Sequence, residues 1–494
     1  MKYRSTCVAS ALLLAVLLSL AGALAAKAQE DYEVPPPPVA FTGGLDTRIR
    51  QVFLHNLLDF DDDGGPAADK LLLASDAHFF RIRHRIWGQF KLHSGPRLFA
   101  RFTTEWRKYL DPYLAPEKTQ IIADNLYLDI PRLPGVPLSA RIGRQDIVRG
   151  EGFILLEGGP ADGSRSIYHN ALLLGFDAQE LGLERTKVEL LAIRNPAWDP
   201  IPIANGATDE QKASPHGQYK PIVENDETAL GAYITSRLFK PQQIEAYYLY
   251  KEEEDEALAD PHLKLHTLGA RLSGELPADF DYAAEGAVQF GTHELEPRLG
   301  AQLDGGAASL DHRSYGGYAW IARDLLFLWR PRIKTGAVFL SGDDPAERDL
   351  PCACDDIRFQ NEAWVPPFSR WPKWSELYIY TLIPEQGRVA NWSNMLALHA
   401  SIDFTLSSKS HFSYGFYYLR APYPLVAEDG AGAHTTYPLY GTGNERGQLH
   451  RWKFSTQLTD AVTWHFLVER FAAGDFYYAQ DDAYFLRWEL MWKR

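Results

Sequence analysis

Apolar and polar residues alternate with a period of two, in segments of about ten residues, along most of the chain. In residues 80–92, one parity holds the apolar residues and the other holds a series of arginines. Successive side chains of a strand point to opposite faces, so this segment predicts a strand with one apolar and one charged face. The alternation recurs over 98–107, 396–407 and 484–493, and we find no long segment with helical spacing of apolar residues.

The connections between these segments alternate between short turns and longer polar loops. The short turns cover residues 93–96, 131–137, 240–242, 277–280 and 407–410, and the longer loops cover 55–76, 198–226, 291–312, 344–388 and 421–446. Pairing them predicts about eighteen strands, and an even strand number with this layout is typical of outer-membrane barrels. We therefore expect residues 44–494 to form one all-β domain, a transmembrane antiparallel up-and-down β-barrel with a water-filled lumen.

A soluble sandwich or propeller is the alternative explanation of this alternation, since one face of an antiparallel sheet then covers a core. Two features favour the membrane: the chain ends inside an amphipathic strand, and aromatic residues gather near predicted strand ends, as in interfacial girdles. These aromatic residues are Trp87, Trp106, Tyr247, Tyr248, Trp320, Tyr417, Tyr418, Trp452, Trp464, Trp488 and Trp492.

The N-terminus has the pattern of a secretory signal peptide over residues 1–28. Lys2 and Arg4 precede an apolar run over 8–24, and Ala26-Lys27-Ala28 supplies small residues for cleavage. An uncleaved anchor is the alternative, because the apolar run is long. Residues 29–43 follow as a proline-rich lead-in, and the protein is expected in a bacterial outer membrane, in contact with its lipid.

Composition and charge narrow the classes of function. With 46% hydrophobic and 23% charged residues the chain is not a disordered one, and its net charge of −14 argues against nucleic-acid binding. Three cysteines are too few for a disulfide scaffold or a four-cysteine zinc site. No Gly-x-Ser-x-Gly, His-Glu-x-x-His or phosphate-cradling loop occurs, so we expect no enzyme and no catalytic residue.

Arginines dominate the polar parity of the first three predicted strands. On the lipid face each would cost about 2–4 kcal/mol, so we expect them to face the lumen. The planar guanidinium binds carboxylates in a bidentate manner, which suits a pore for anions. Alternatively, they neutralise lumen acids such as Glu105, Asp129 and Asp403 in a structural wall. The arginines are Arg48, Arg50, Arg81, Arg83, Arg85, Arg101 and Arg107.

Six short segments have an order and spacing found in a known family. They are Gly44–Arg48, Trp87–Gln89, Leu126–Asp129, the Gly-Arg-Gln strand at 139–145, Phe471–Tyr477 and Trp488–Trp492. Together they resemble the alginate-export outer-membrane porins over nearly the whole chain after residue 28. The resemblance implies a monomeric eighteen-stranded barrel through which an anionic uronate polymer crosses the membrane at an arginine-lined constriction.

The resemblance also assigns individual residues. Arg48 and Arg83 match basic lumen residues of the first and second strands, and Arg144 is the arginine of Gly-Arg-Gln. Asp129 is expected beside them in the pore. Where the alginate porin carries further basic residues, this chain has Asp124, Asp146, His465 and Leu467.

The expected function is passage of an alginate-type polysaccharide or related anionic sugars, with periplasmic secretion components as partners in the export case. A general small-solute porin, a barrel enzyme and an adhesin are the alternatives.

Three further patterns lie in predicted loops. Asp59, Asp61 and Asp63 begin like a calcium loop, but Lys70 stands where a bidentate glutamate is needed, which leaves a looser surface Ca²⁺ site or a solvated acidic loop. We expect no other cofactor. Cys352 and Cys354 are too close for an unstrained disulfide. Four tryptophans could stack on sugars or fold a loop onto the rim, and these are Trp364, Trp371, Trp374 and Trp392.

Overall fold

The structure is a computed structural model of the chain. It describes residues 40–62, 76–92, 95–111, 120–156, 168–197, 225–254, 262–294, 309–344, 362–386, 391–425 and 439–494. The predicted signal peptide, most of the proline-rich lead-in, Asp63, Cys352 and Cys354 lie outside these residues.

Eighteen strands make up the described fold. They are β1 (Ala40–His55), β2 (Ala77–Lys91), β3 (Arg97–Asp111), β4 (Gln120–Ile130), β5 (Leu138–Gln145), β6 (His169–Asp177), β7 (Thr186–Asn195), β8 (Asp226–Ser236), β9 (Gln243–Glu254), β10 (His262–Leu276), β11 (Phe280–Glu294), β12 (Ser309–Asp324), β13 (Arg332–Leu340), β14 (Met395–Thr405), β15 (Ser410–Arg420), β16 (Glu445–Gln457), β17 (Val462–Ala473) and β18 (Asp482–Lys493). The described helices are single turns: η2 (Ala178–Leu181), α4 (Tyr378–Thr381) and α5 (Ile383–Gln386).

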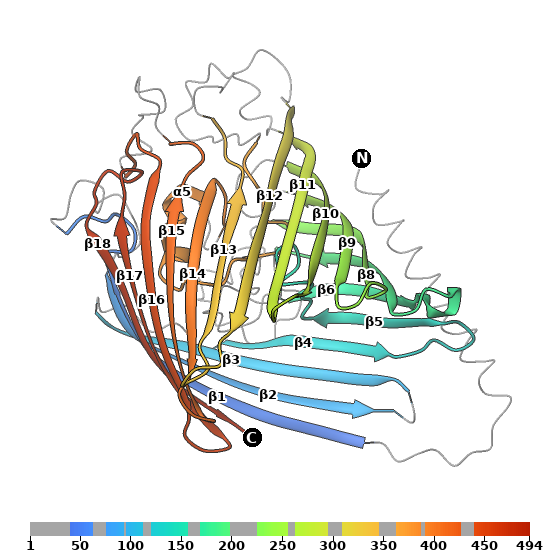
Figure 1. The fold of residues 1–494 in the computed structure, drawn as a ribbon. Coiled ribbons are helices and arrows are strands. Elements are labelled where there is room, and N and C mark those ends of the chain that lie inside the picture. The colour runs from blue at the N-terminus through green and yellow to red at the C-terminus, as the bar shows by residue number, and fades with distance from the viewer. Residues whose placement is uncertain are drawn as a thin grey trace, which may run out of the picture.

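Each strand pairs antiparallel with the next along the chain, and β18 pairs with β1 from Asp46↔Lys493 to His55↔Tyr484. The sheet therefore closes on itself, as the ring of strands in Figure 1 shows. This confirms the predicted fold class, including the strand number. No helix in the described part of the chain is long and apolar enough to cross a membrane.

The two faces of the barrel follow the predicted alternation. Apolar side chains of one parity are exposed, such as Ile86 at 59%, Leu190 at 53% and Leu268 at 52% of their surface. The other parity is buried or half-buried and holds most of the charged residues. An apolar outer face and a polar inner face match a barrel that has lipid outside and water-accessible polar groups inside.

The ends of the barrel differ in the length of their connections. The connections that follow even-numbered strands are short, with β10 and β11 joined through residues 277–279. Most connections that follow odd-numbered strands are longer, and that between β13 and β14 spans residues 341–394. Short turns face the periplasm in outer-membrane barrels, which orients the molecule.

The aromatic girdle predicted from the sequence is only partly present. Tyr247 and Tyr417 are 5% and 8% exposed, and both lie on the inner face rather than at the lipid interface. The ring of Tyr417 stacks on Trp374 at a centroid distance of 4.6 Å, and the hydroxyl of Tyr247 donates to Glu285. Trp320, whose indole donates to a residue inside the barrel, and Trp87, which lies opposite inward-facing Arg101, are on the inner face as well. The prediction for these four residues was wrong because a strand-end position does not reveal the face of an aromatic side chain.

The orientation of β10 gives a test of the lipid-facing surface. Leu268 lies near the middle of β10 on the exposed face, and Leu276 ends the strand on the same face. We expect Leu268→Arg to lower the free energy of unfolding by about 2–4 kcal/mol, and the control Leu276→Arg by less than about 1 kcal/mol. Urea unfolding in phospholipid vesicles, followed by tryptophan fluorescence, measures both, and equal losses would contradict the assigned membrane depth.

Candidate functional site

Residues 362–386, which follow β13, cross the inside of the barrel. On β9, Lys251 Nζ donates to the carbonyl of Pro367 at 2.6 Å. On β18, Arg487 forms an ion pair with Glu376 at 2.9 Å. Strands β9 and β18 are nine positions apart in a ring of eighteen, so these contacts lie on opposite walls. The segment therefore spans the lumen, whereas the sequence predicted an external polar loop over 344–388.

A buried carboxylate on β17 holds the turn before α4. Glu469 is fully buried and accepts hydrogen bonds from Ser375 Oγ at 2.9 Å, and from the amides of Glu376 and Leu377 at 2.9 and 2.8 Å. Hydrogen bonds to an ionised carboxylate are stronger than those between neutral groups. Glu469 thus fixes the backbone of the crossing segment to the wall.

A buried ion pair fixes the end of the segment at α5. Arg446 of β16 is 0% exposed and donates to both carboxylate oxygens of Glu385, at 2.7 and 2.6 Å. The same guanidinium donates to the carbonyl of Asn394 and to the hydroxyl of Tyr378, and it lies over the ring of Phe476. With this many partners, the charge of Arg446 is compensated within the protein.

The tryptophans of this connection pack inside the barrel. Trp364 and Trp392 are 2% and 0% exposed, and Trp364 stacks on Phe153 at 5.0 Å between ring centroids. Trp371 meets the same Phe153 ring edge-on at 5.3 Å. These side chains pack the crossing segment into the lumen, a third arrangement besides the sugar-stacking and rim positions considered from the sequence.

A second segment, residues 146–156 after β5, also folds inward. The amide of Leu156 donates to the carbonyl of Phe368 at 2.9 Å, and the amide of Phe368 donates to Ile154 at 3.2 Å. Ser369 donates to the carbonyl of Gly152. The two inward segments are therefore joined by backbone hydrogen bonds inside the barrel.

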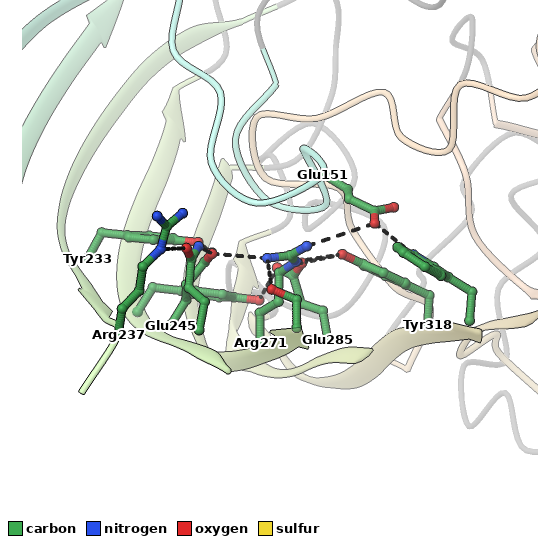
Figure 2. A network of polar contacts seen from close by, with 11 residues as sticks. Glu151, Tyr233, Arg237, Glu245, Arg271, Glu285 and Tyr318 are labelled. Carbon is green, nitrogen blue, oxygen red and sulfur yellow. Dashed lines mark hydrogen bonds and ion pairs between the residues drawn. The ribbon is translucent and has the colours of Figure 1, made fainter. Parts of the chain in front are cut away.

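A polar network fixes the 146–156 segment to the wall of β8–β12 (Figure 2). Glu151 accepts from the indole N–H of Trp320 at 2.6 Å and lies 3.9 Å from Arg271. Arg271 donates to Glu245 at 3.0 Å and to the hydroxyl of Tyr318 at 3.2 Å. One arginine thus links the inward segment to residues of three strands.

Tyrosines satisfy the remaining carboxylate oxygens of this network. Tyr318 and Tyr247 donate to the two oxygens of Glu285 at 2.9 and 3.0 Å, and Tyr233 donates to Glu245. Buried charge is tolerated where each oxygen has a donor. On this part of the inner face, carboxylates and tyrosine hydroxyls therefore surround one arginine of the network, Arg271.

Seven arginines lie on the inner face of β1–β3, and we call them the arginine wall: Arg48, Arg50, Arg81, Arg83, Arg85, Arg101 and Arg107. Arg48, Arg50, Arg81 and Arg83 are buried. The side chains of Arg85, Arg101 and Arg107 keep 17%, 16% and 23% of their surface exposed, so these three are accessible to a solute.

The strand register places arginines of this wall directly opposite one another. Arg48 lies opposite Arg83, and Arg50 lies opposite Arg81. Like charges at directly opposed positions destabilise an antiparallel pair. The sequence pattern predicted the inward face of these residues, but the opposition depends on the register between strands.

Carboxylates lie among the arginines, as the structural interpretation of the sequence expected. Arg83 pairs with Asp46 at 2.8 Å, Arg81 with Glu105 at 2.7 Å, and Arg50 with Glu489. Arg101 contacts both Asp124 and Asp146. Among the described residues, Arg48 also lies near Glu489, Arg85 near Asp124 and Arg107 near Glu105, so each arginine of the wall has a carboxylate within 4 Å.

Arg144 lies apart from the arginine wall. It follows Gly143, whose φ of +122° and close approach to the carbonyl of Leu126 exclude a side chain. Its register partner Leu126 is exposed on the outer face. The guanidinium itself is buried over the ring of Tyr168 and donates to the carbonyl of Ala123 at 2.8 Å. Among the described residues, the same guanidinium group also donates to the side chain of Asn170 of β6 at 3.2 Å.

Asp129 lies between two arginines near the short-turn end. It accepts from Arg141 at 3.1 Å and lies 3.3 Å from Arg97. Asp403, expected in the same role, lies opposite Arg332 in the register of β13 and β14.

The residues that depart from the alginate porin pattern have defined contacts. Asp124 is fully buried and also accepts from Thr103 at 2.8 Å, and Asp146 accepts from Asn125 at 2.9 Å. His465 lies 3.5 Å from Glu489, and Leu467 is fully buried. Asp124 and Asp146 therefore add negative charge directly beside the arginine wall.

The calcium hypothesis stays a prediction. Asp59 is buried, and the amide of Asp61 donates to the side chain of Asn56 at 2.9 Å. Among the described residues, which do not include Asp63, no group of three or more His, Cys, Asp or Glu is arranged to hold a metal ion.

The barrel and its polar interior define the class of protein: an outer-membrane β-barrel of the porin type. A family model for alginate export matches residues 217–488, and the chain belongs to this family. Comparison with curated proteins gave no match.

Solved structures with a similar fold are outer-membrane proteins of Pseudomonas aeruginosa. OccK2 (OpdF) is 10% identical with a TM-score of 0.52, over 92% of this chain and 97% of that one. OccK11 (OpdR) is 8% identical with a TM-score of 0.51, over 92% and 95%. A crystal structure of OccK2 in complex with glucuronate, 11% identical over 92% and 97%, also has a TM-score of 0.52.

The Arg446–Glu385 pair gives a test of the crossing segment. Arg446→Met leaves the Glu385 carboxylate buried without its guanidinium, which costs about 3–5 kcal/mol. We expect faster amide hydrogen exchange over residues 376–386, measured by mass spectrometry. The double variant Arg446→Met with Glu385→Leu removes both charges and should restore slow exchange, because a matched apolar pair is tolerated. Similar exchange in the single and double variants would show that this pair does not hold the segment.

Proposed function

We propose that this protein is an outer-membrane channel through which carboxylated sugars pass along the arginine wall. The cargo is an alginate-type polysaccharide or a related sugar acid. The observation that carries the proposal is the opposition of Arg48 to Arg83 and of Arg50 to Arg81. Two unfavourable pairs in succession on one face of a sheet are typical of a functional site, where proteins depart from local stability rules.

The chemistry of arginine suits this cargo. Its guanidinium stays charged at any physiological pH, and its planar fork matches the two oxygens of a carboxylate. Arg85, Arg101 and Arg107 offer partly exposed guanidinium groups along one wall. Several moderate contacts in series let an anion enter and also leave, which a single tight site does not.

Two comparisons support the proposed cargo class. The alginate export family is named for the secretion of a uronate polymer, and OccK2, a protein of similar fold, has been crystallised with the sugar acid glucuronate. In the alginate-type version, a periplasmic secretion apparatus delivers the polymer. The proposal contains no catalytic step, since transport accounts for the family and the fold.

A general small-solute channel is the second candidate. Asp124 and Asp146 lie beside Arg101 and reduce the positive charge that a polyanion would meet. This arrangement favours small solutes over a highly charged polymer. The degree of anion preference separates the two candidates, because a general channel needs little of it.

Arg85 provides the test of anion preference. Removing one cation beside the path should lower the anion-to-cation permeability ratio about two- to fivefold, since unit charges about 4 Å apart in water interact by about 1 kcal/mol. Reversal potentials of Arg85→Gln in planar bilayers under a KCl gradient measure the ratio. Arg85→Lys keeps the charge and should keep the selectivity.

Arg470→Gln is the matched control, because it removes a positive charge that does not face the lumen. Arg470 pairs with Asp482 at 2.7 Å and lies on the outer parity of β17, opposite in orientation to buried Glu469 and Phe471. We expect no change in selectivity from this variant. Unchanged reversal potentials in Arg85→Gln, together with a wild-type channel lacking anion preference, would reject the proposed function.

A further inference from the structure

A hollow lined by basic residues lies on the inner face of β4–β9, at the short-turn end of the barrel. Its volume is about 770 Å³, within the range of small-molecule pockets. Six cationic side chains line it: Arg141, Arg149, Arg185, Lys187, Arg237 and Lys240. Asp129, Asp146 and Glu189 are the carboxylates among its described lining residues, so cations outnumber them two to one.

The hollow is lined by residues other than those of the arginine wall and adjoins that wall at Asp146, which pairs with Arg101. None of the seven wall arginines is among the described residues that line it. Arg185 belongs to the connection between β6 and β7, and Lys240 to the turn between β8 and β9. Because these short connections face the periplasm, the hollow opens toward the periplasmic mouth. Arg149, from the inward segment after β5, forms its inner limit.

Two of the three carboxylates, Glu189 and Asp129, are engaged with cations that line the hollow, and Asp146 pairs with Arg101 outside it. Glu189 accepts from Arg149 at 2.8 Å and from Lys187 at 2.7 Å, and Asp129 accepts from Arg141 at 3.1 Å. Arg185 and Lys240 are exposed, and within the described part of the chain neither forms an ion pair. These two charges therefore remain available to an anion that arrives from the periplasm.

A neighbouring hollow extends this surface. It has a volume of about 710 Å³, includes Arg132, and shares four lining residues with the first hollow: Ser139, Gly175, Arg185 and Lys187. A chain of several sugar units can therefore occupy both hollows. Ser139 and Thr235 supply hydroxyl groups for sugar hydroxyls, and the surrounding cations supply the charge for carboxylates.

We propose that these two joined hollows form a periplasmic capture site for a short stretch of a carboxylated polysaccharide. The site would raise the local concentration of the chain before it reaches the arginine wall. The inference takes the class of cargo from the proposed function, on which it rests. It adds a second binding site and the side of the membrane from which the cargo binds. A polyanion is bound more strongly from the short-turn end than from the long-loop end.

Channel block from either side tests the site. Single channels in planar bilayers are exposed to a galacturonate tetramer, first in one chamber and then in the other. Wild-type channels should be blocked at a lower concentration from one side. In the double variant Arg185→Gln, Lys240→Gln, the concentration for half-block on that side should rise about fivefold, which corresponds to about 1 kcal/mol. Half-block from the opposite side should not change.

Arg330→Gln with Lys409→Gln is the matched control. Both residues are exposed in short turns of β12–β13 and β14–β15, outside the described lining of the hollows, and Arg330 shares the positive φ of Arg185. This control should keep the wild-type difference between sides.

The outcomes separate the capture site from the channel itself. An anion-selective wild-type channel that is blocked equally from both sides, or an unchanged difference in the Arg185→Gln, Lys240→Gln variant, would overturn the capture site alone. A wild-type channel without anion preference would instead overturn the proposed function.

Discussion

The structure depends on one constraint: in hydrocarbon, every backbone N–H and C=O needs a partner within the protein. An open sheet fails this requirement at its edges, and the pairing of β18 with β1 removes them. Closure also fixes the two faces, because alternate side chains must then meet either lipid or the lumen. The inward position of the arginines on β1–β3 follows from this alternation.

The polar inner face serves two different purposes on different walls. On β9 and β16–β18, charged residues such as Lys251, Glu469 and Arg446 hold the segment that crosses the lumen. On β8–β12, Arg271 and its carboxylate partners hold the shorter inward segment. The charged side chains named on these walls are paired within the protein. The wall of β1–β3 differs, since arginines of neighbouring strands lie directly opposite one another there.

Removing one partner of a buried ion pair is far more costly than removing both, so the anchoring walls tolerate little change. In the arginine wall, the unfavourable free energy comes instead from repulsion between like charges. Arg48 opposite Arg83 is unfavourable in itself, and Asp46 and Glu489 offset part of the repulsion. The ion pairs of the wall are therefore compatible with the proposed function: they stabilise the arginines, while the side chains of Arg85, Arg101 and Arg107 keep part of their surface exposed.

The sequence by itself determined the barrel, because a period of two is the direct consequence of a strand between lipid and water. The strand number followed from counting the alternating segments, and the inward orientation of residues such as Arg81 followed from the alternation itself. The sequence pattern did not predict which segments fill the interior of the barrel. Residues 362–386 were predicted to be part of an external loop. Their aromatic residues, including Trp364 and Trp371, are typical of a buried segment, but the sequence pattern is equally typical of residues that bind sugars or cover the rim.

Only the tertiary structure decided which side chains meet across the lumen. Lys251 and Pro367 are 116 residues apart, and Arg446 and Glu385 are 61 apart. Such contacts depend on barrel closure and on the course of the inward segments, which leave no local periodicity. The basic hollow near Arg185 and Lys240 is hidden in the sequence because its charges come from two turns, from strands β5 and β7 and from the inward segment after β5, which the pairing of neighbouring strands and the course of that segment bring together.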